Sequence, residues 1–339
     1  MAMTDRIRRL RQESHDAPVT LSSERARLLT EFSRRRLGLI SEPVRRALAF
    51  RYILENKEVY IGSDELIVGE RGPRPKAAPT YPEVCCHTME DLEALDTREK
   101  IPFSVSEETR DEYREEIIPF WSGRTLRESI MREMTPEWRR AYEAGVFTEF
   151  MEQRAPGHTV LDDKIYRKGI LDLIAEIQDA LDALDHLNDP EAYGKQEELR
   201  AMEIAAEAII LYARRHAMKA RELAEAEGEE DRREELLRIA RVCEHVPAHP
   251  PRDFWEALQA YWFVHLGVIT ELNTWDAFNP GHLDHHLEPF YREGLAAGSL
   301  TREEAEELLQ CLWVKFNNHP APPKVGITAE ESATYTDFA

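Results

Sequence analysis

The stretch FWEALQAYWFVHLGVITELNTWDAFNPGHLDHH, residues 254–286, joins a strongly apolar segment to a run of polar side chains. Residues 254–268 are apolar on nearly every side, which is the pattern of a helix buried all round. This helix is too short to cross a bilayer. Residues 269–286 place carboxylates, amides and aromatic rings around an Asn-Pro-Gly turn. Polar loops held by a rigid scaffold often form binding sites, so we expect a site to begin where this helix ends.

Two further segments have the same loop-like composition. They are residues 153–158 (QRAPGH) and residues 317–338 (NNHPAPPKVGITAEESATYTDF). Both combine rigid Pro and Gly with polar side chains that can meet a ligand. We predict that the three segments together form one polar pocket, and that the helices between them are scaffold.

Apolar residues at helical spacing predict that most of the chain is helical and that strands are scarce. Ser41 marks one helix start, a capping box of Thr301 with Glu304 marks another, and Gly298 marks a helix end. The predicted helices are a short basic one within 1–20 and others at about 22–37, 41–54, parts of 86–118, a short one from 135, 163–186, 190–227, 231–244, 281–297 and 301–316.

Residues 59–83 separate the first helices from the rest. The β-branched residues of 59–68 (VYIGSDELIV) predict a pair of small strands, or a strand and a turn. Residues 70–83 are rich in proline, which fixes φ and removes backbone donors. We therefore expect an extended strap along the surface, with Arg71, Arg74 and Lys76 paired to acidic helices. The alternative is a floppy linker between domains, but we favour one continuous unit.

The chain is acidic, with 65 Asp and Glu against 44 Lys and Arg and a formal net charge of -21. Such a surface repels phosphate backbones, and no basic stripe is concentrated anywhere, so nucleic-acid binding is not expected. No apolar run reaches the roughly 20 residues of a membrane span. The start, MAMTDRIRRLRQES, lacks the apolar middle of a secretion signal. We expect a soluble, cytoplasmic protein.

Few motifs of common chemistry are present. Four scattered cysteines without a CxxC do not predict a disulfide framework, and we expect them to be buried or bystander thiols. Phosphate-binding glycine loops and the Gly-x-Ser-x-Gly elbow are absent. His282 and His286 share one helix face with His285 and Asp284 close by, as zinc ligands would, but no HExxH accompanies them. We therefore predict no metal here.

Asp276 is the most informative carboxylate, since it stands between Trp275 and Phe278. A carboxylate walled by aromatic rings is costly to bury unless a cation or hydrogen-bond donors meet it. At roughly 4 Å and an effective dielectric of about 20, a ligand ammonium would contribute on the order of 4 kcal/mol before desolvation. The alternative is that Asp276 caps the following helix. Glu271 lies in a similar position before the turn and could equally be a structural hydrogen-bond acceptor. His158 is either a packed histidine or a catalytic one.

Five segments in order resemble the glycyl radical enzymes, the superfamily of pyruvate formate-lyase-like proteins, and the resemblance covers nearly the whole chain. Within the superfamily the similarity is greatest to members that dehydrate trans-4-hydroxy-L-proline. The segments are ELIVGERGPRPKAAPTYPE (65–83), EQRAPGH (152–158), FWEALQAYWFVHL (254–266), ELNTWDAFNPGHLDHHL (271–287) and VKFNNHPAPPKVGITAEESATYTDF (314–338).

The resemblance implies an α/β fold, a ten-stranded barrel wrapped by helices, of which residues 1–339 form the predominantly helical N-terminal portion. It implies a glycyl radical installed by an iron-sulfur activating enzyme that uses S-adenosylmethionine. That radical oxidises a cysteine to a thiyl, which takes hydrogen from the substrate carbon beside the ring nitrogen. Hydroxide then leaves from the next carbon, so that hydroxyproline becomes a pyrroline-5-carboxylate.

The resemblance also assigns roles to residues of this sequence. Asp276 matches the carboxylate that meets the substrate amine, and Phe150 matches a residue lining the substrate ring. His158 matches a residue near the leaving hydroxyl. Ser332 and Phe338 match residues on the substrate carboxylate side and in the pocket wall.

The sequence departs from the family pattern because it contains neither the cysteine loop nor the C-terminal glycyl radical domain. None of its cysteines lies in a matching motif. We therefore expect this chain to be inactive alone, as a fragment or as half of a split enzyme whose second chain carries both loops. The complete enzyme is expected to be a homodimer.

Other readings stay open on the sequence alone. The substrate could instead be that of another glycyl radical enzyme: a diol dehydratase, a C–S or C–N lyase, an arylacetate decarboxylase or a formate acetyltransferase-like protein. An anionic sulfonate would call for arginine near residue 150, where Glu149 and Glu152 stand instead. A third reading is a catalytically inactive truncated protein that binds a partner or a small amine.

Overall fold

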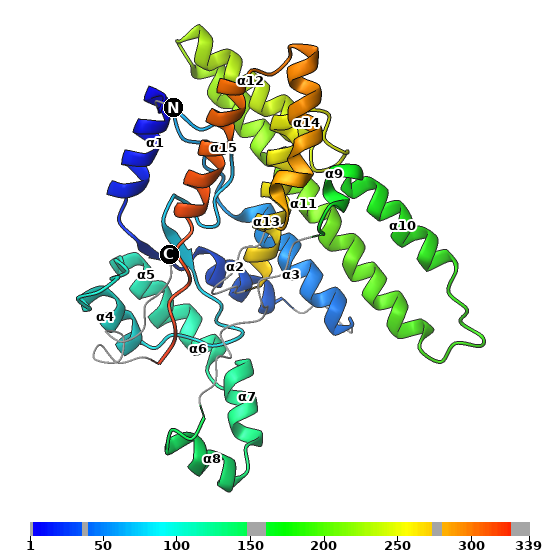
Figure 1. Cartoon of the computed structure of the whole chain (residues 1–339). Helices are drawn as coiled ribbons and strands as arrows, with labels where there is room; N and C mark the ends of the chain where they lie inside the picture. The colour runs from blue at the N-terminus through cyan, green and yellow to red at the C-terminus, as the bar shows by residue number, and fades with distance from the viewer. Residues whose placement is uncertain (1–2, 36–39, 148–160, 273–279, 327–339) are drawn as a thin grey trace.

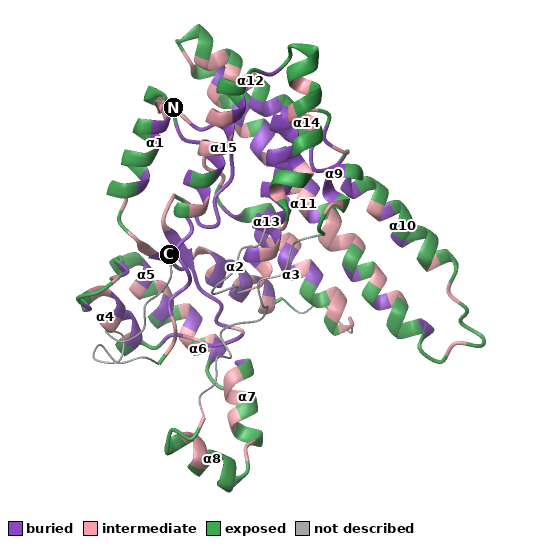
Figure 2. Cartoon of the chain, in the orientation of Figure 1, coloured by how far each residue is buried: buried purple, intermediate pink, exposed green. Residues whose placement is uncertain are grey.

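A computed structural model describes residues 3–35, 40–147, 161–272 and 280–326 of the chain (Figure 1). Helix α13, Phe254–Glu271, lies at its centre, and almost every one of its side chains is buried (Figure 2). Asp253 caps the helix by accepting from the backbone N–H of Glu256. The prediction of a helix buried all round is confirmed.

Longer helices pack around α13 and form the larger of two apolar cores. The long helix α11 contacts α3, α10 and α12, while α14 and α15 pack on α13 and α1 lies along α15 (Figure 1). Their bounds are α1 Asp5–Asp16, α3 Glu42–Asn56, α9 Lys164–Arg167, α10 Ile170–Asp182, α11 Ala192–Ala226, α12 Glu230–His245, α14 Leu283–Ala297 and α15 Arg302–Asn317.

A second apolar core gathers shorter elements. Helix α3 joins the two cores, because Phe50 and Leu54 belong to the first and Ala49 and Ile53 to the second. Helices α7 and α8 follow and have no buried side chains of their own. The bounds are α2 Glu24–Ser33, α4 Met89–Thr97, α5 Glu107–Glu112, a π-helix at Tyr113–Ile117, α6 Ile118–Trp121, α7 Leu126–Glu133 and α8 Pro136–Glu143.

Most of the predicted helices are confirmed with small shifts of their ends, together with the capping box of Thr301 and Glu304 and the left-handed stop at Gly298. The helix predicted at 163–186 is instead divided into α9 and α10. The break falls at Gly169, where an added Cβ would lie 2.2 Å from the carbonyl oxygen of Ala248. No helix in the described ranges is both long and apolar enough to cross a bilayer.

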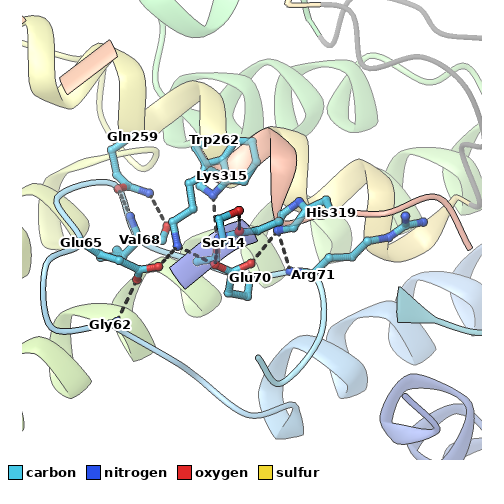
Figure 3. Close-up of polar contacts among 12 residues, drawn as sticks. Ser14, Gly62, Glu65, Val68, Glu70, Arg71, Gln259, Trp262, Lys315 and His319 are labelled. Carbon is cyan, nitrogen blue, oxygen red and sulfur yellow. Dashed lines mark hydrogen bonds and ion pairs between the residues drawn. The ribbon is translucent and has the colours of Figure 1, made fainter. Parts of the chain in front are cut away.

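The prediction of strands at 59–68 is wrong. In the described part of the chain the only strands are β1, Thr20–Ser22, and β2, Ala77–Pro79, which pair in parallel. The backbone at the end of the segment 59–68 is instead hydrogen-bonded by side chains of α13. Gln259 accepts from the N–H of Val68 and donates to its carbonyl, both at 2.9 Å (Figure 3). A segment whose polar backbone groups are met by side chains needs no partner strand.

The prediction of an extended surface strap at 70–83 is only partly right, because residues 71–76 form bends and a turn and only β2 is extended. Arg74 is exposed, but most of the strap is buried. Glu70 and Arg71 are only 1% and 3% exposed. Of the expected pairs with acidic helices, Arg74 forms an ion pair with Glu58, just beyond the end of α3. Arg71 instead contacts Tyr81 and backbone oxygen. The linker alternative is excluded as well, because the strap lies between packed elements.

Replacing Gln259 by Met tests how far α13 holds this segment. The substitution keeps the side-chain length but leaves the buried N–H and C=O of Val68 without partners, which costs about 1–3 kcal/mol per group. We expect a loss of stability of that size in urea denaturation. Gln178→Met, on the exposed face of α10, is the matched control and should change stability little. Equal effects of the two substitutions would contradict the role given to Gln259.

Candidate functional site

The five residues assigned to substrate by the resemblance fall outside the described residues. The structure does describe where two of the three predicted loops begin. One of these points is the end of α13, up to Leu272, and the other is the segment 318–326 after α15. The five undescribed residues are Phe150, His158, Asp276, Ser332 and Phe338.

Side chains from the strap hold the last carbonyl groups of α13. Nε of Arg71 donates to the carbonyl of Ile269 at 3.1 Å, and its Nη2 donates to the hydroxyl of Tyr81 at 2.6 Å. The Tyr81 hydroxyl in turn donates to the same Ile269 carbonyl. The last carbonyls of a helix have no partner within the helix, so these bonds fix the point where the chain leaves α13.

Arg25 of α2 adds a second bond at this helix end. Its Nε donates to the carbonyl of Thr270 at 2.6 Å, and its Nη2 lies 2.8 Å from Oε1 of Glu83. Its guanidinium carbon stands 3.9 Å from the centre of the Tyr81 ring. Positive charge near the C-terminus of a helix is also favoured by the helix dipole.

A buried charge cluster holds the chain after α15 (Figure 3). Nζ of Lys315 lies 2.7 Å from Oε1 of Glu70 and also forms an ion pair with Glu65. Nε2 of His319 lies 2.8 Å from Oε2 of Glu70. Asn318 is joined to Ser14 of α1, whose Oγ donates to its Oδ1 at 2.6 Å. The turn after α15 is therefore tied to both the strap and α1.

The two carboxylates of this cluster are shifted in opposite directions. Burial raises the pKa of Glu70, but attraction to Lys315 and the hydrogen bond from His319 outweigh burial and lower the pKa from 4.5 to about 2. Burial dominates for Glu65 and raises its pKa, in spite of Lys315. Burial also lowers the pKa of His319, although Glu70 opposes this. The backbone N–H of Arg71 also points to Nε2 of His319, at 3.3 Å, so this nitrogen lies between Glu70 and the strap backbone.

Lys57 fixes the backbone that carries these side chains. Its Nζ donates to the carbonyls of Glu70 and Arg71, each at 2.9 Å. The hydroxyl of Tyr212 donates to the Glu70 carbonyl at 3.1 Å. Burial lowers the pKa of Lys57 to about 8, because its contacts are with neutral oxygens and not with a paired carboxylate.

Glu271 acts as a structural acceptor at the end of α13, which was one of the two predicted roles. It forms an ion pair with Arg46 of α3. Burial raises its pKa, although Arg25 and Arg46 oppose this. The N-cap position of α14 is His282. Asp276 lies outside the described residues, so both of its roles stay predictions.

The histidines of α14 do not converge. The ring of His286 lies against Tyr166, with centroids 5.1 Å apart, and its Nε2 is 3.6 Å from Asp162. The rings of His282 and His285 lie together instead, 5.6 Å apart. Across the described ranges, no group of three His, Cys, Asp or Glu side chains is arranged to hold a metal ion.

The four cysteines carry thiols, and none of them forms a disulfide in the described structure. Cys85, Cys243 and Cys311 are buried, as predicted for bystander thiols. Burial raises the pKa of Cys86 and of Cys311 to about 12. Thiols with raised pKa are weak nucleophiles at neutral pH.

The cluster of Glu70, Lys315 and His319 was not predicted from the sequence. One signal was present, since Lys315 lies at helical spacing from Leu308, Cys311 and Leu312 on the apolar face of α15. A lysine on such a face is rarely buried unless it is paired. Its partners could not be found in the same way, because they lie about 250 residues earlier in the chain.

Known proteins similar to this chain identify its class. Residues 3–339 match the pyruvate formate lyase-like family, and the chain belongs to this family. It is 57% identical over 335 residues to trans-4-hydroxy-L-proline dehydratase of Clostridioides difficile, covering 99% of this chain and 42% of the relative.

Solved structures agree with this assignment. Hydroxyproline dehydratase from Clostridioides difficile, with trans-4-hydroxy-L-proline bound, aligns with a TM-score of 0.94 at 56% identity, covering 100% of this chain and 43% of that chain. A glycyl radical enzyme from Archaeoglobus fulgidus aligns with a TM-score of 0.85 at 33% identity, covering 94% of this chain and 41% of that chain. The predicted fold, a mostly helical portion of the glycyl radical enzyme fold, is confirmed. The chain spans less than half of the length of these relatives.

Replacing Glu70 by Gln should change how stability depends on pH. The folded pKa of Glu70 is below its unfolded value of 4.5, so its contribution is full above pH 4.5 and is lost as the pH falls towards 2. We expect the parent to be more stable than the variant at pH 7 and the difference in free energy of unfolding to narrow below pH 4.5, as measured by urea denaturation. Glu108→Gln, exposed on α5, is the control. A difference for Glu70→Gln that stays constant with pH would contradict this assignment.

Proposed function

We propose that this chain is the substrate-binding portion of a glycyl radical lyase that dehydrates trans-4-hydroxy-L-proline to a pyrroline-5-carboxylate. The observation that carries the proposal is the 57% identity to the hydroxyproline dehydratase, which extends over 99% of this chain. The matching solved structure was obtained with trans-4-hydroxy-L-proline bound. Identity of this extent includes all the segments from which the proposed site residues come.

Within this proposal Asp276 meets the substrate amine, Phe150 lines the ring and His158 stands near the leaving hydroxyl. Ser332 and Phe338 form the carboxylate side and the pocket wall. The charge of the substrate supports the role of Asp276. A cyclic amino acid brings the cation that a carboxylate between aromatic rings requires, because an unpaired buried charge is costly.

The radical chemistry would come from outside residues 1–339. We propose that these residues are the N-terminal portion of a pyruvate formate lyase-like domain, and that the cysteine and glycine loops belong to further polypeptide of the same or a second chain. The glycyl radical supplies the thiyl that removes hydrogen from the substrate. An S-adenosylmethionine iron-sulfur enzyme installs it in the cytoplasm, and the complete enzyme forms a homodimer. The residues of this chain bind and orient the amino acid for that step.

Two other functions remain as outcomes of the test. A diol, sulfonate, amino alcohol or arylacetate substrate would keep the family and change the ligand. A catalytically inactive binding protein would keep the ligand and lose the reaction. We expect the complete enzyme, activated anaerobically, to form pyrroline-5-carboxylate from trans-4-hydroxy-L-proline and not to convert propane-1,2-diol or isethionate. Product from propane-1,2-diol or isethionate instead would favour the alternative substrate. No product from any of the three compounds would favour the catalytically inactive binding protein.

Asp276→Asn tests the central assignment. Removing the charge leaves the substrate ammonium without its counter-ion, and we expect affinity for trans-4-hydroxy-L-proline to fall by roughly 10- to 100-fold, which corresponds to a lost charge-assisted bond of about 1.5–3 kcal/mol. Calorimetric titration of the enzyme without its radical measures this directly. Asp284→Asn, exposed on α14, is the control. Unchanged affinity in Asp276→Asn would remove the residue from the substrate site.

A further inference from the structure

Two neighbouring residues of the strap reach the starts of two different loops. The side chain of Arg71 contacts the end of α13, which leads into residues 273–279. The side chain of Glu70 contacts Lys315 and His319, beyond which the chain leads into residues 327–339. The proposed site residues Asp276 and Ser332 follow these two points in the sequence. One dipeptide therefore joins the starts of both loops.

The backbone of this dipeptide has little freedom. Its two carbonyls are held by Lys57, and glycines stand on both sides of it. Gly69 has a φ of +115°, and an added Cβ there would lie 2.6 Å from Leu266 of α13. At Gly72 an added Cβ would lie 2.3 Å from the carbonyl oxygen of Ala77. The order Gly-Glu-Arg-Gly thus lets the strap approach α13 and turn back on itself.

The bonds made by the two side chains are charged and buried. Guanidinium to carbonyl, and ammonium to carboxylate, are the stronger kinds of hydrogen bond. Nη1 of Arg71, Nδ1 of His319 and Oγ1 of Thr270 are buried and have no hydrogen-bond partner among the residues that the structure describes. The bonds that the cluster does make are costly to break, because a shift would leave further buried polar groups unpaired.

We propose that Glu70 and Arg71 are positioning residues that set the distance between the end of α13 and the turn after α15, from which the two proposed substrate segments continue. Arg71 fixes the start of the loop that follows α13, and Glu70 fixes the start of the loop that follows α15. Because both belong to one segment, each side chain ties one of these two points to the same piece of backbone. The inference rests on the proposed function for the identity of the ligand, but not for the linkage of the two loops.

Amide hydrogen exchange of the protein without ligand tests the linkage. Arg71→Met removes both guanidinium bonds, and we expect exchange to become about ten-fold faster in peptides covering 270–282. Glu70→Gln should do the same for peptides covering 320–339 and less for 270–282. Tyr81→Phe removes the hydroxyl that donates to Ile269 and accepts from Nη2 of Arg71, but it keeps the bond from Nε of Arg71 to Ile269. It gives a milder version of the Arg71 effect if Arg71→Met does not fold.

Glu256→Gln is the matched control. Like Glu70, Glu256 is a buried carboxylate. It lies on α13 and pairs with Arg252, at the end of the helix opposite to Ile269. It should lower the melting temperature without faster exchange at either loop. If the control accelerates the loops equally, or if Arg71 and Glu70 variants give the same exchange pattern, the side chains contribute general stability and the positioning role is wrong.

Titration with trans-4-hydroxy-L-proline separates this inference from the proposed function. If the parent binds the amino acid, we expect Arg71→Met to raise Kd by about ten-fold and Arg71→Lys, which keeps one donor, to restore part of the affinity. If the parent does not bind it, the proposed substrate is wrong, and the exchange pattern alone then decides whether the two loops are linked. Unchanged Kd in Arg71→Met, with a parent that binds, would overturn the positioning role.

Discussion

The carboxylate of Glu70 is the group on which the arrangement depends. It is 1% exposed, and a charge at that depth is tolerated only with partners of opposite charge and with hydrogen bonds. Lys315 and His319 supply these partners from the end of α15. The strap and the end of α15 are therefore held at one place, because separating them would leave a carboxylate buried alone.

The same device recurs along α13. Gln259, Trp255 and Trp262 bind backbone groups of the segment 66–69, and this segment delivers the strap to its buried position. The strap then returns to α13 through Arg71, which binds the carbonyl of Ile269. Side chains of α13 thus hold the segment that leads into the strap, and the strap in turn holds the C-terminal end of α13. Hydrogen bonds from side chains satisfy these buried backbone groups, as the bonds of a β-sheet would in another fold.

This construction suits the family to which the chain belongs. A radical reaction on a small substrate requires the binding groups to keep their positions within a fraction of an ångström. Polar loops meet that requirement only when a rigid scaffold holds their ends. In this chain the starts of two loops are held by buried charged side chains, Glu70 and Arg71, and the helices α11 and α13 belong to the core behind them.

The sequence alone determined the local elements and the class of protein. The spacing of apolar residues predicted α13, and spacing together with a capping box predicted α15, because these patterns lie within a few turns of the helix itself. Ordered motifs predicted the family and the three loops. The tertiary structure decided that residues 59–68 form no strand, that the strap is buried, and that Glu70 meets Lys315. These outcomes depend on partners some 190 to 250 residues apart in the chain, and no local pattern records which distant side chain will satisfy a buried group.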